Sequence, residues 1–159
     1  MRLGWSVAAL IGALLQACGG TACGPDSDVV ARVIDGDTVE LVGGERVRYL
    51  LVDAPEASGA RGQECYAVEA REFNRTLVEG RSVRLRYDGP CSDAFDRLLA
   101  FVFVDGQSVS ELLVQRGYAC VLHIPPSGDG EAAKLRNLEA QAAAVRRGLW
   151  GYCSANPCR

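Results

Sequence analysis

The chain has 159 residues, which is enough for one domain with a hydrophobic core and too few for two domains of ordinary size. Its apolar residues (48%) and charged residues (23%) are balanced as in an ordinary globular protein. The net charge of −3 excludes a protein that coats nucleic acid by bulk positive charge, so phosphate chemistry would need a local basic cluster or a metal ion.

The N-terminal segment has the features of a secretory signal. Arg2 supplies a positive charge, and the apolar run over residues 3–15 is too short to span a membrane. The sequence LQAC, residues 15–18, resembles a bacterial lipobox, in which the cysteine becomes the lipid-bearing N-terminus. The alternative is an ordinary signal peptide that is cleaved nearby. We assign residues 1–17 to a signal peptide of the lipoprotein type and predict lipidation of Cys18. The protein is then exported, and is either held at the membrane of the cell envelope by this lipid or secreted.

The following segment and the cysteine count agree with export. Residues 18–28 are rich in Gly, Ser, Thr and Asp, and we assign them to a flexible tether. Of the seven cysteines, six remain when Cys18 carries lipid, and an even number in an exported chain predicts disulfides. Six cysteines allow fifteen pairings, so the count predicts three bridges without naming the partners.

Alternating apolar and polar residues predict a series of short strands. Asp35-Gly36 and Gly43-Gly44 are turn signals between the first three, since paired glycines supply the positive φ that a hairpin turn needs. In the third strand, Tyr49 and Asp53 are expected on one face and Arg48 on the other. The five predicted strands cover residues 29–34, 37–41, 46–52, 83–87 and 97–104.

Apolar residues at helical spacing predict three helices. The first covers residues 66–77. The second, residues 108–117, begins with Ser108 and Glu111 at the spacing of a capping box. The third covers residues 131–147, and its apolar face is expected to consist of Leu135, Leu138, Ala142 and Val145.

This order of elements predicts the fold class. A small closed barrel with a helix after the third strand is the most economical arrangement of five strands, one central helix and two later helices, and the oligonucleotide-binding fold has this plan. We therefore expect an α+β domain over residues 29–152, a five-stranded OB-fold β-barrel with three helices. A Cys-containing C-terminal tail, residues 153–159, follows it.

Three acidic residues and two arginines form the candidate site. Asp37, Asp53 and Glu56 offer hard oxygen ligands, which suit Ca²⁺ or Mg²⁺. Arg48 and Arg97 lie in or beside apolar strands and therefore need anionic partners, such as a phosphate. The alternative is that both arginines form structural salt bridges with these acids, and their spacing does not decide between the two interpretations.

Five segments resemble the thermonuclease (staphylococcal nuclease) family, in the same order and with nearly the same spacing. The resemblance covers about residues 30–150, and several of the segments carry one of the candidate site residues. The segments are RVIDGDTVEL (32–41), VRYLLVDAPE (47–56), CYAVEA (65–70), SDAFDRLLAFV (92–102) and KLRNLEAQAAAVRRGLW (134–150).

The resemblance implies a Ca²⁺-dependent phosphodiesterase that cleaves DNA and RNA on an OB-fold barrel and leaves 3′-phosphates. Asp37 and Asp53 would bind Ca²⁺ through their carboxylates, and Ala54 through its backbone carbonyl. Glu56 would act as the general base or position the attacking water. The charge that grows on the phosphate oxygens would be stabilised by Arg48 and Arg97.

The chain departs from the family where the substrate is gripped. Ala54 replaces a Thr, which should be tolerated because only its main-chain oxygen is thought to bind metal. The family's Lys-Tyr pair is replaced by Ala94-Phe95, and its nucleotide-packing tyrosines correspond to about His123 and Pro125. The catalytic residues are retained, whereas nucleotide affinity and base preference remain open.

Two further expectations complete the hypothesis. Cys65 and Cys91 flank the active-site loops, and we expect them to form a disulfide that holds the loop of Arg97.

The partners are DNA and RNA as substrates and a membrane reached through the lipid anchor, and the protein is expected to be a monomer. The alternative functions are a nuclease-like nucleic-acid-binding module and an envelope lipoprotein that keeps only the fold.

Overall fold

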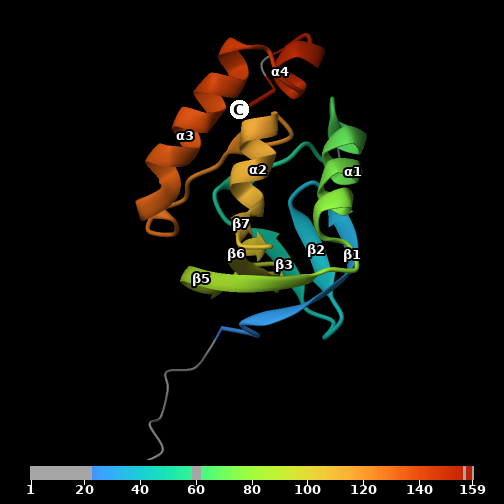
Figure 1. Cartoon of the computed structure of the whole chain (residues 1–159), viewed down its shortest axis with the longest axis vertical. Helices are drawn as coiled ribbons and strands as arrows, with labels where there is room; N and C mark the ends of the chain where they lie inside the picture. Colours follow the sequence, from blue (N-terminus) through green and yellow to red (C-terminus); the bar gives the residue numbers. More distant parts are fainter. Residues whose placement is uncertain (1–22, 59–61, 156, 159) are drawn as a thin grey trace, which may run out of the picture.

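The computed structural model describes residues 23–58, 62–155 and 157–158. The predicted signal peptide and Cys18 lie outside these residues. A β-barrel forms one end of the molecule and four helices cover the other (Figure 1). None of the described helices is long and apolar enough to cross a membrane.

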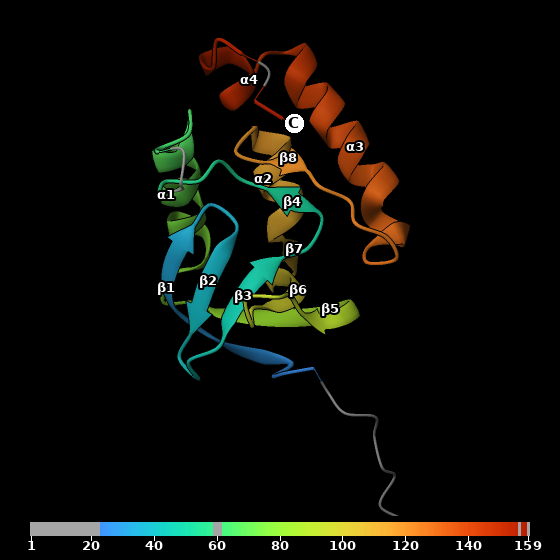
Figure 2. The same cartoon turned by 180° about the vertical axis from the view of Figure 1, so that it is seen from behind.

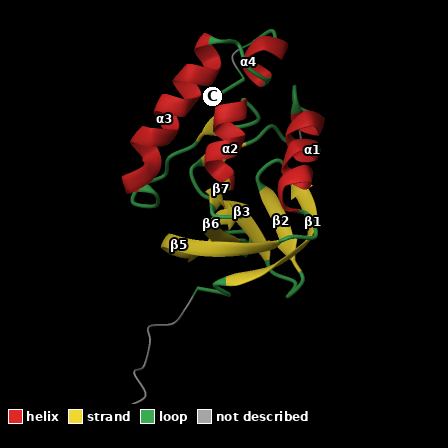
Figure 3. Ribbon diagram, viewed as in Figure 1, coloured by secondary structure: helices red, strands yellow, loops and turns green. Residues whose placement is uncertain are grey.

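Five strands close the barrel. Their hydrogen-bonded order is β3-β2-β1-β5-β6, and a parallel pairing of β3 with β6 completes the ring. All other pairings within the ring are antiparallel, which is the predicted OB-fold topology. Figure 3 shows the barrel strands gathered below most of the helical part. The strands are β1 (Ser27–Asp35), β2 (Thr38–Leu41), β3 (Arg46–Tyr49), β4 (Val52–Asp53), β5 (Ser82–Ser92), β6 (Leu98–Val104), β7 (Gln107–Ser108) and β8 (Cys120–Val121).

The predicted third strand, residues 46–52, is in fact two strands. A turn at Leu50 and Leu51 separates β3 from β4, and Leu51 has a positive φ of 66°. Because the turn reverses the alternation of side chains, Arg48 and Asp53 point to the same side, and the prediction that they face apart is wrong. After the turn, β4 leaves the barrel and pairs with β8 (Figure 2).

The helices are α1 (Ala67–Val78), α2 (Val109–Arg116), α3 (Asp129–Ala144) and the short α4 (Leu149–Tyr152). The N-cap part of the predicted capping box is confirmed, since the Ser108 hydroxyl accepts a hydrogen bond from the Glu111 N–H at 3.4 Å, and Gly117 caps the C-terminus. On α3, Leu135 is buried as predicted. Val145 is 63% exposed, because the helix ends at Ala144 and the chain then turns away.

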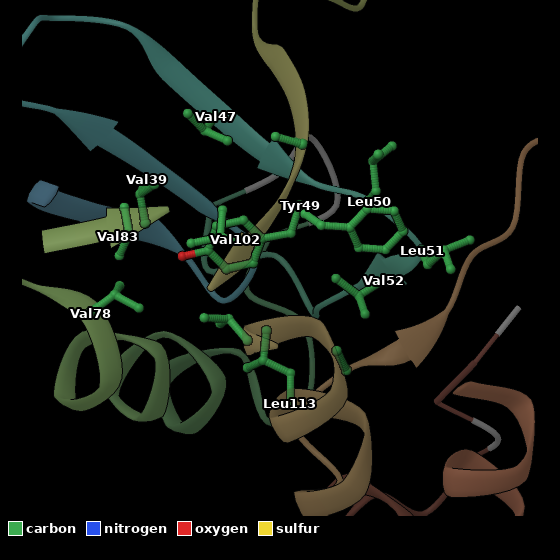
Figure 4. Packing of buried hydrophobic residues seen from close by; sticks show 14 of the residues in the cluster. Val39, Val47, Tyr49, Leu50, Leu51, Val52, Val78, Val83, Val102 and Leu113 are labelled. Atoms are coloured by element: carbon green, nitrogen blue, oxygen red, sulfur yellow. The ribbon is translucent and has the colours of Figure 1, made fainter. Parts of the chain in front are cut away.

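The core lies between the barrel and the first two helices. Tyr49 and Val102 from the barrel, Val78 from α1 and Leu113 from α2 are packed together (Figure 4). All four are almost fully buried, so each contributes on the order of 2 kcal/mol through the apolar surface that it removes from water.

Three disulfides join segments that are far apart in the sequence: Cys23 with Cys91, Cys65 with Cys153, and Cys120 with Cys158. Three bridges were predicted, but the predicted pairing of Cys65 with Cys91 is wrong. Cys65 precedes α1 and lies beside α4, whereas Cys91 lies at the end of β5 beside the N-terminal segment. A disulfide needs Cα atoms within about 7 Å of each other, and the bonds that form have Cα–Cα distances of 4.9 to 6.0 Å.

The tether prediction also needs correction over its described part. Cys23 is bonded to Cys91, and β1 begins at Ser27, which pairs with Arg84 of β5. Residues 23–28 are therefore fixed to the barrel. Since the sequence of this segment is polar and rich in small residues, its composition alone gave no sign of the strand.

Candidate active site

Asp37 lies in the two-residue turn between β1 and β2, and this turn is packed tightly against its neighbours. A Cβ atom on Gly36 would lie 2.6 Å from the Ala54 Cβ and 3.0 Å from the Ala70 Cβ, so only glycine fits without a shift. The turn thus touches both the segment after β4 and α1. This close approach places the Asp37 carboxylate beside the chain at Ala54.

The Asp37 carboxylate is 5% exposed and has several donors around it. Its oxygens accept hydrogen bonds from the Ala54 N–H at 2.6 Å and from the Thr38 hydroxyl at 3.0 Å. Burial raises the pKa of Asp37 above its ordinary value, and the negative charge of Asp53 adds to this, although Arg48 and the two hydrogen bonds oppose it. The site therefore carries a carboxylate that is costly to ionise unless a further cation lies close by.

Arg48 lies between Asp37 and Asp53. One terminal guanidinium nitrogen is 3.3 Å from Asp37 and 2.9 Å from Asp53. The other donates to the backbone carbonyls of Tyr49 at 3.1 Å and of Val52 at 2.6 Å, the two residues that flank the turn. The turn at residues 50–51 thus orients the arginine as well as the acid that it contacts.

Glu56 lies beyond Asp53 at the rim of a cavity of about 260 Å³. Its side chain is exposed, and it shares this cavity with Asp53, Ala54 and Glu64. The backbone of Glu56 is held by Glu64, whose carboxylate accepts from the Glu56 N–H at 3.1 Å and whose own N–H donates to the Glu56 carbonyl at 2.9 Å. Glu56 is thus placed next to Asp53, with its carboxylate open to solvent.

Arg97 lies on the other side of Arg48, and the two arginines line a second cavity of about 230 Å³. Asp93 accepts from the Arg97 side chain at 2.7 Å and from its backbone N–H at 3.1 Å. Burial would raise the pKa of Asp93, but these bonds and one from the Phe95 N–H outweigh it and hold that pKa below its ordinary value. Arg97 therefore pairs with Asp93, and not with Asp37 or Asp53.

Only some of the positions that differ from the family lie in the wall of the second cavity. Pro125 lies in its wall with the aliphatic side chains of Leu122 and Ile124. His123 instead contacts Asp129 at 2.7 Å and Arg136 at 3.0 Å. Leu122, Ile124 and Pro125 thus give this part of the cavity an aliphatic lining, while the exposed Phe95 lies near Arg97, whose guanidinium carbon is 5.5 Å from the ring centroid.

Two buried polar residues support the site, and the sequence alone did not single them out. Asn74 of α1 is fully buried and donates to the Asp35 carbonyl at 3.1 Å, just before the turn that carries Asp37. Ser110 of α2 is also fully buried and donates to the Leu50 carbonyl at 3.0 Å. Each helix thus stabilises one of the two turns. The sequence signal that could have identified them is a polar residue on the apolar face of a helix, where the side chain is buried.

The donor set fits a hard divalent cation. Carboxylate oxygens of Asp37 and Asp53 contact the same guanidinium nitrogen, so both lie around one cationic group. Two carboxylates against a single arginine, one buried (Asp37) and one exposed (Asp53), leave negative charge that a divalent ion would neutralise. The N–H of Ala54 is engaged by Asp37, and its carbonyl stays the predicted third ligand.

Known proteins resemble this chain in sequence. The family described as staphylococcal nuclease homologue matches residues 46–152. Endonuclease YncB of Bacillus subtilis is 36% identical over 126 residues, covering 75% of this chain and 59% of that protein. SPbeta prophage-derived endonuclease YokF of Bacillus subtilis is 32% identical, covering 75% and 42%. The chain therefore spans less than two thirds of these two relatives. Thermonuclease of Staphylococcus intermedius is 30% identical over 129 residues, covering 79% of this chain and 76% of that protein.

Proposed function

Since the chain belongs to the family of staphylococcal nuclease homologues, we propose that it is a Ca²⁺-dependent phosphodiesterase that hydrolyses DNA and RNA. The observation that carries this proposal is the arrangement of two carboxylates around Arg48, with Glu56 in the cavity on one side and Arg97 in the cavity on the other. The substrate phosphate would lie between the two cavities, with the sugar and base in the second.

Asp37 and Asp53 would hold the Ca²⁺ ion through their carboxylates, with the Ala54 carbonyl as a further ligand. When bound, this ion would draw electron density from a phosphate oxygen and offset the charge that develops there. The burial of Asp37, which raises the pKa of its carboxyl, supports this role for a cation.

Glu56 would take the proton from a water molecule that attacks phosphorus in line with the leaving oxygen. Its carboxylate is exposed at the rim of the first cavity, so both water and a phosphate can reach it. The new bond joins the water oxygen to phosphorus, and the bond from phosphorus to the 5′ oxygen breaks. The 5′ oxygen takes a proton from solvent as it leaves, so the products are a 3′-phosphate and a free 5′-hydroxyl.

Arg48 and Arg97 would stabilise the additional charge on the phosphate oxygens. Their position in the wall of one cavity supports this role, while their present carboxylate partners support the alternative of structural salt bridges. The two interpretations differ in what an alanine substitution does. A structural arginine affects folding, whereas a catalytic one lowers the rate in a protein that remains folded.

The test is cleavage of single-stranded DNA by the purified protein, with Ca²⁺ and with a chelator. We expect cleavage only with Ca²⁺, and a loss of at least about 100-fold in kcat for Glu56→Gln, Arg48→Ala and Arg97→Ala. Arg32→Ala is the matched control, because Arg32 forms an exposed ion pair with Glu40 at 2.6 Å outside both cavities. Binding of DNA without Ca²⁺-dependent cleavage would instead favour a nucleic-acid-binding module.

We also propose that the protein is exported and carries a lipid on Cys18. Three disulfides support export, since such bonds persist in oxidising compartments. Membrane fractionation of Cys18→Ser should release the protein into the soluble fraction. If this variant remains with the membrane, the lipidation proposal is wrong.

A further inference from the structure

The C-terminal tail forms part of the wall of the cavity that holds Glu56. Cys153, Ser154, Ala155 and Pro157 line this cavity together with Asp53 and Glu56. The match to the family ends at residue 152, so this wall lies beyond the part of the chain that the family defines. The candidate base is thus enclosed on one side by a segment that lies outside the residues matched by the family.

A short chain of contacts links Glu56 to that tail. Glu64 holds the Glu56 backbone through two hydrogen bonds, of 3.1 Å and 2.9 Å, that run in opposite directions. The next residue, Cys65, is bonded to Cys153 at the end of α4. The position of the Glu56 backbone is therefore coupled, over two residues and one disulfide, to the C-terminal helix.

The far end of this link is fixed to the core. Leu149, the first residue of α4, is fully buried, and its N–H donates to the Gly117 carbonyl at 2.9 Å. Cys153 donates its N–H to the Leu149 carbonyl at 3.0 Å, so the disulfide leaves from an ordered helix end. Tyr66, next to Cys65, adds a ring contact to Tyr152 with centroids 5.4 Å apart. Because Cys153 is held in place, its disulfide can restrain Cys65 and, through Glu64, the backbone of Glu56.

We propose that Glu64 and the Cys65–Cys153 disulfide are positioning elements for Glu56, through which the C-terminal tail holds the base at the metal site. This inference rests on the proposed function. A general base must lie within hydrogen-bond reach of its water, and a displacement of about 1 Å can cost on the order of 100-fold in rate. Glu56 is exposed, so its own side-chain packing restrains it little, and the backbone contacts carry the restraint.

The test compares Glu64→Ala, Glu64→Gln and the double variant Cys65→Ser/Cys153→Ser in cleavage of single-stranded DNA with saturating Ca²⁺. We expect kcat to fall by roughly 10- to 100-fold in Glu64→Ala and in the double variant, with KM changed less than threefold. Glu64→Gln should stay within threefold of the wild type, because its amide oxygen still accepts from the Glu56 N–H. Glu69→Ala, an exposed acid in the first turn of α1, is the matched control.

Three further measurements separate positioning from a general loss of structure. Thermal unfolding sets an assay temperature at which every variant is folded, and the disulfide variant Cys23→Ser/Cys91→Ser shows what loss of a distant bridge does. In a Glu56→Gln background, Glu64→Ala should have no further effect on kcat, since there is no base left to position. If the wild type cleaves but Glu64→Ala keeps wild-type kcat, the inference is overturned. If the wild type itself fails to cleave with Ca²⁺, the proposed function fails instead.

Discussion

Substitution of Gly36 by alanine tests whether close packing builds the proposed metal site. The added Cβ would lie 2.6 Å from the Ala54 Cβ, well inside normal contact, and 3.0 Å from the Ala70 Cβ. Ala54 is 6% exposed and Ala70 is fully buried, so neither methyl group can move into solvent. Overpacking of this kind costs about 1–3 kcal/mol. For a domain of this size we expect a fall in Tm of roughly 4 °C per kcal/mol.

The double variant Gly36→Ala/Ala54→Gly makes the steric argument specific. Ala54→Gly alone should cost about 1–2 kcal/mol through the lost methyl group and the added backbone freedom. Because it also removes the nearer clash, the two substitutions together should cost at least about 1 kcal/mol less than their sum. Denaturant unfolding measures all four proteins. The control is Gly130→Ala, since a Cβ at this helical position meets nothing within 4 Å and should be neutral or stabilising. Additive costs, or a Gly36→Ala protein as stable as Gly130→Ala, would refute the reasoning.

Two other predictions concern the buried polar groups of the site. Ser110→Ala removes the only hydroxyl that reaches the Leu50 carbonyl within the described residues, so we expect a loss of about 1–3 kcal/mol in unfolding free energy and a lower kcat. Ser82→Ala, on an exposed face of β5, should stay within about 0.5 kcal/mol of the wild type. The pKa of Asp37 is higher in the folded protein than in the unfolded chain. The contribution of this side chain to the free energy of unfolding is therefore complete below the unfolded pKa, and it is lost as the pH rises through the folded pKa. Without Ca²⁺, Asp37→Asn should therefore be more stable than the wild type at neutral pH, and less stability in a urea titration would contradict the burial argument.

The barrel was predictable because its signals are local. Strand alternation outside residues 50–51, the paired glycines and the Ser108 N-cap each involve only a few consecutive residues, and the structure retains them. The disulfide pairing was not predictable in this way, since it depends on which loops meet in space. Cys65 and Cys153 are 88 residues apart in sequence, and nothing in the sequence near either one indicates its partner.

The turn at Leu50 and Leu51 explains the main error in the candidate site. Both residues are apolar and buried, and a leucine with a positive φ is uncommon, so strand propensity predicted one continuous strand. Tertiary contacts overrule that propensity. Ser110 binds the Leu50 carbonyl and β8 pairs with β4, and both partners come from distant parts of the chain. Asp37, Asp53 and Arg48 lie together in the structure, whereas their mutual orientation could not be read from the sequence.

That orientation bears on how Arg48 could serve both structure and catalysis. One guanidinium nitrogen is held by the carbonyls of Tyr49 and Val52, and neither contact involves a carboxylate. The other nitrogen contacts Asp37 and Asp53, the two residues expected to bind Ca²⁺. If these carboxylates turned to a metal ion, the guanidinium would keep its backbone partners and its orientation, and its second nitrogen would become available to a phosphate oxygen. The bend between β3 and β4 would thus preorganise the arginine before substrate arrives, which is the condition under which such a group lowers a reaction barrier most.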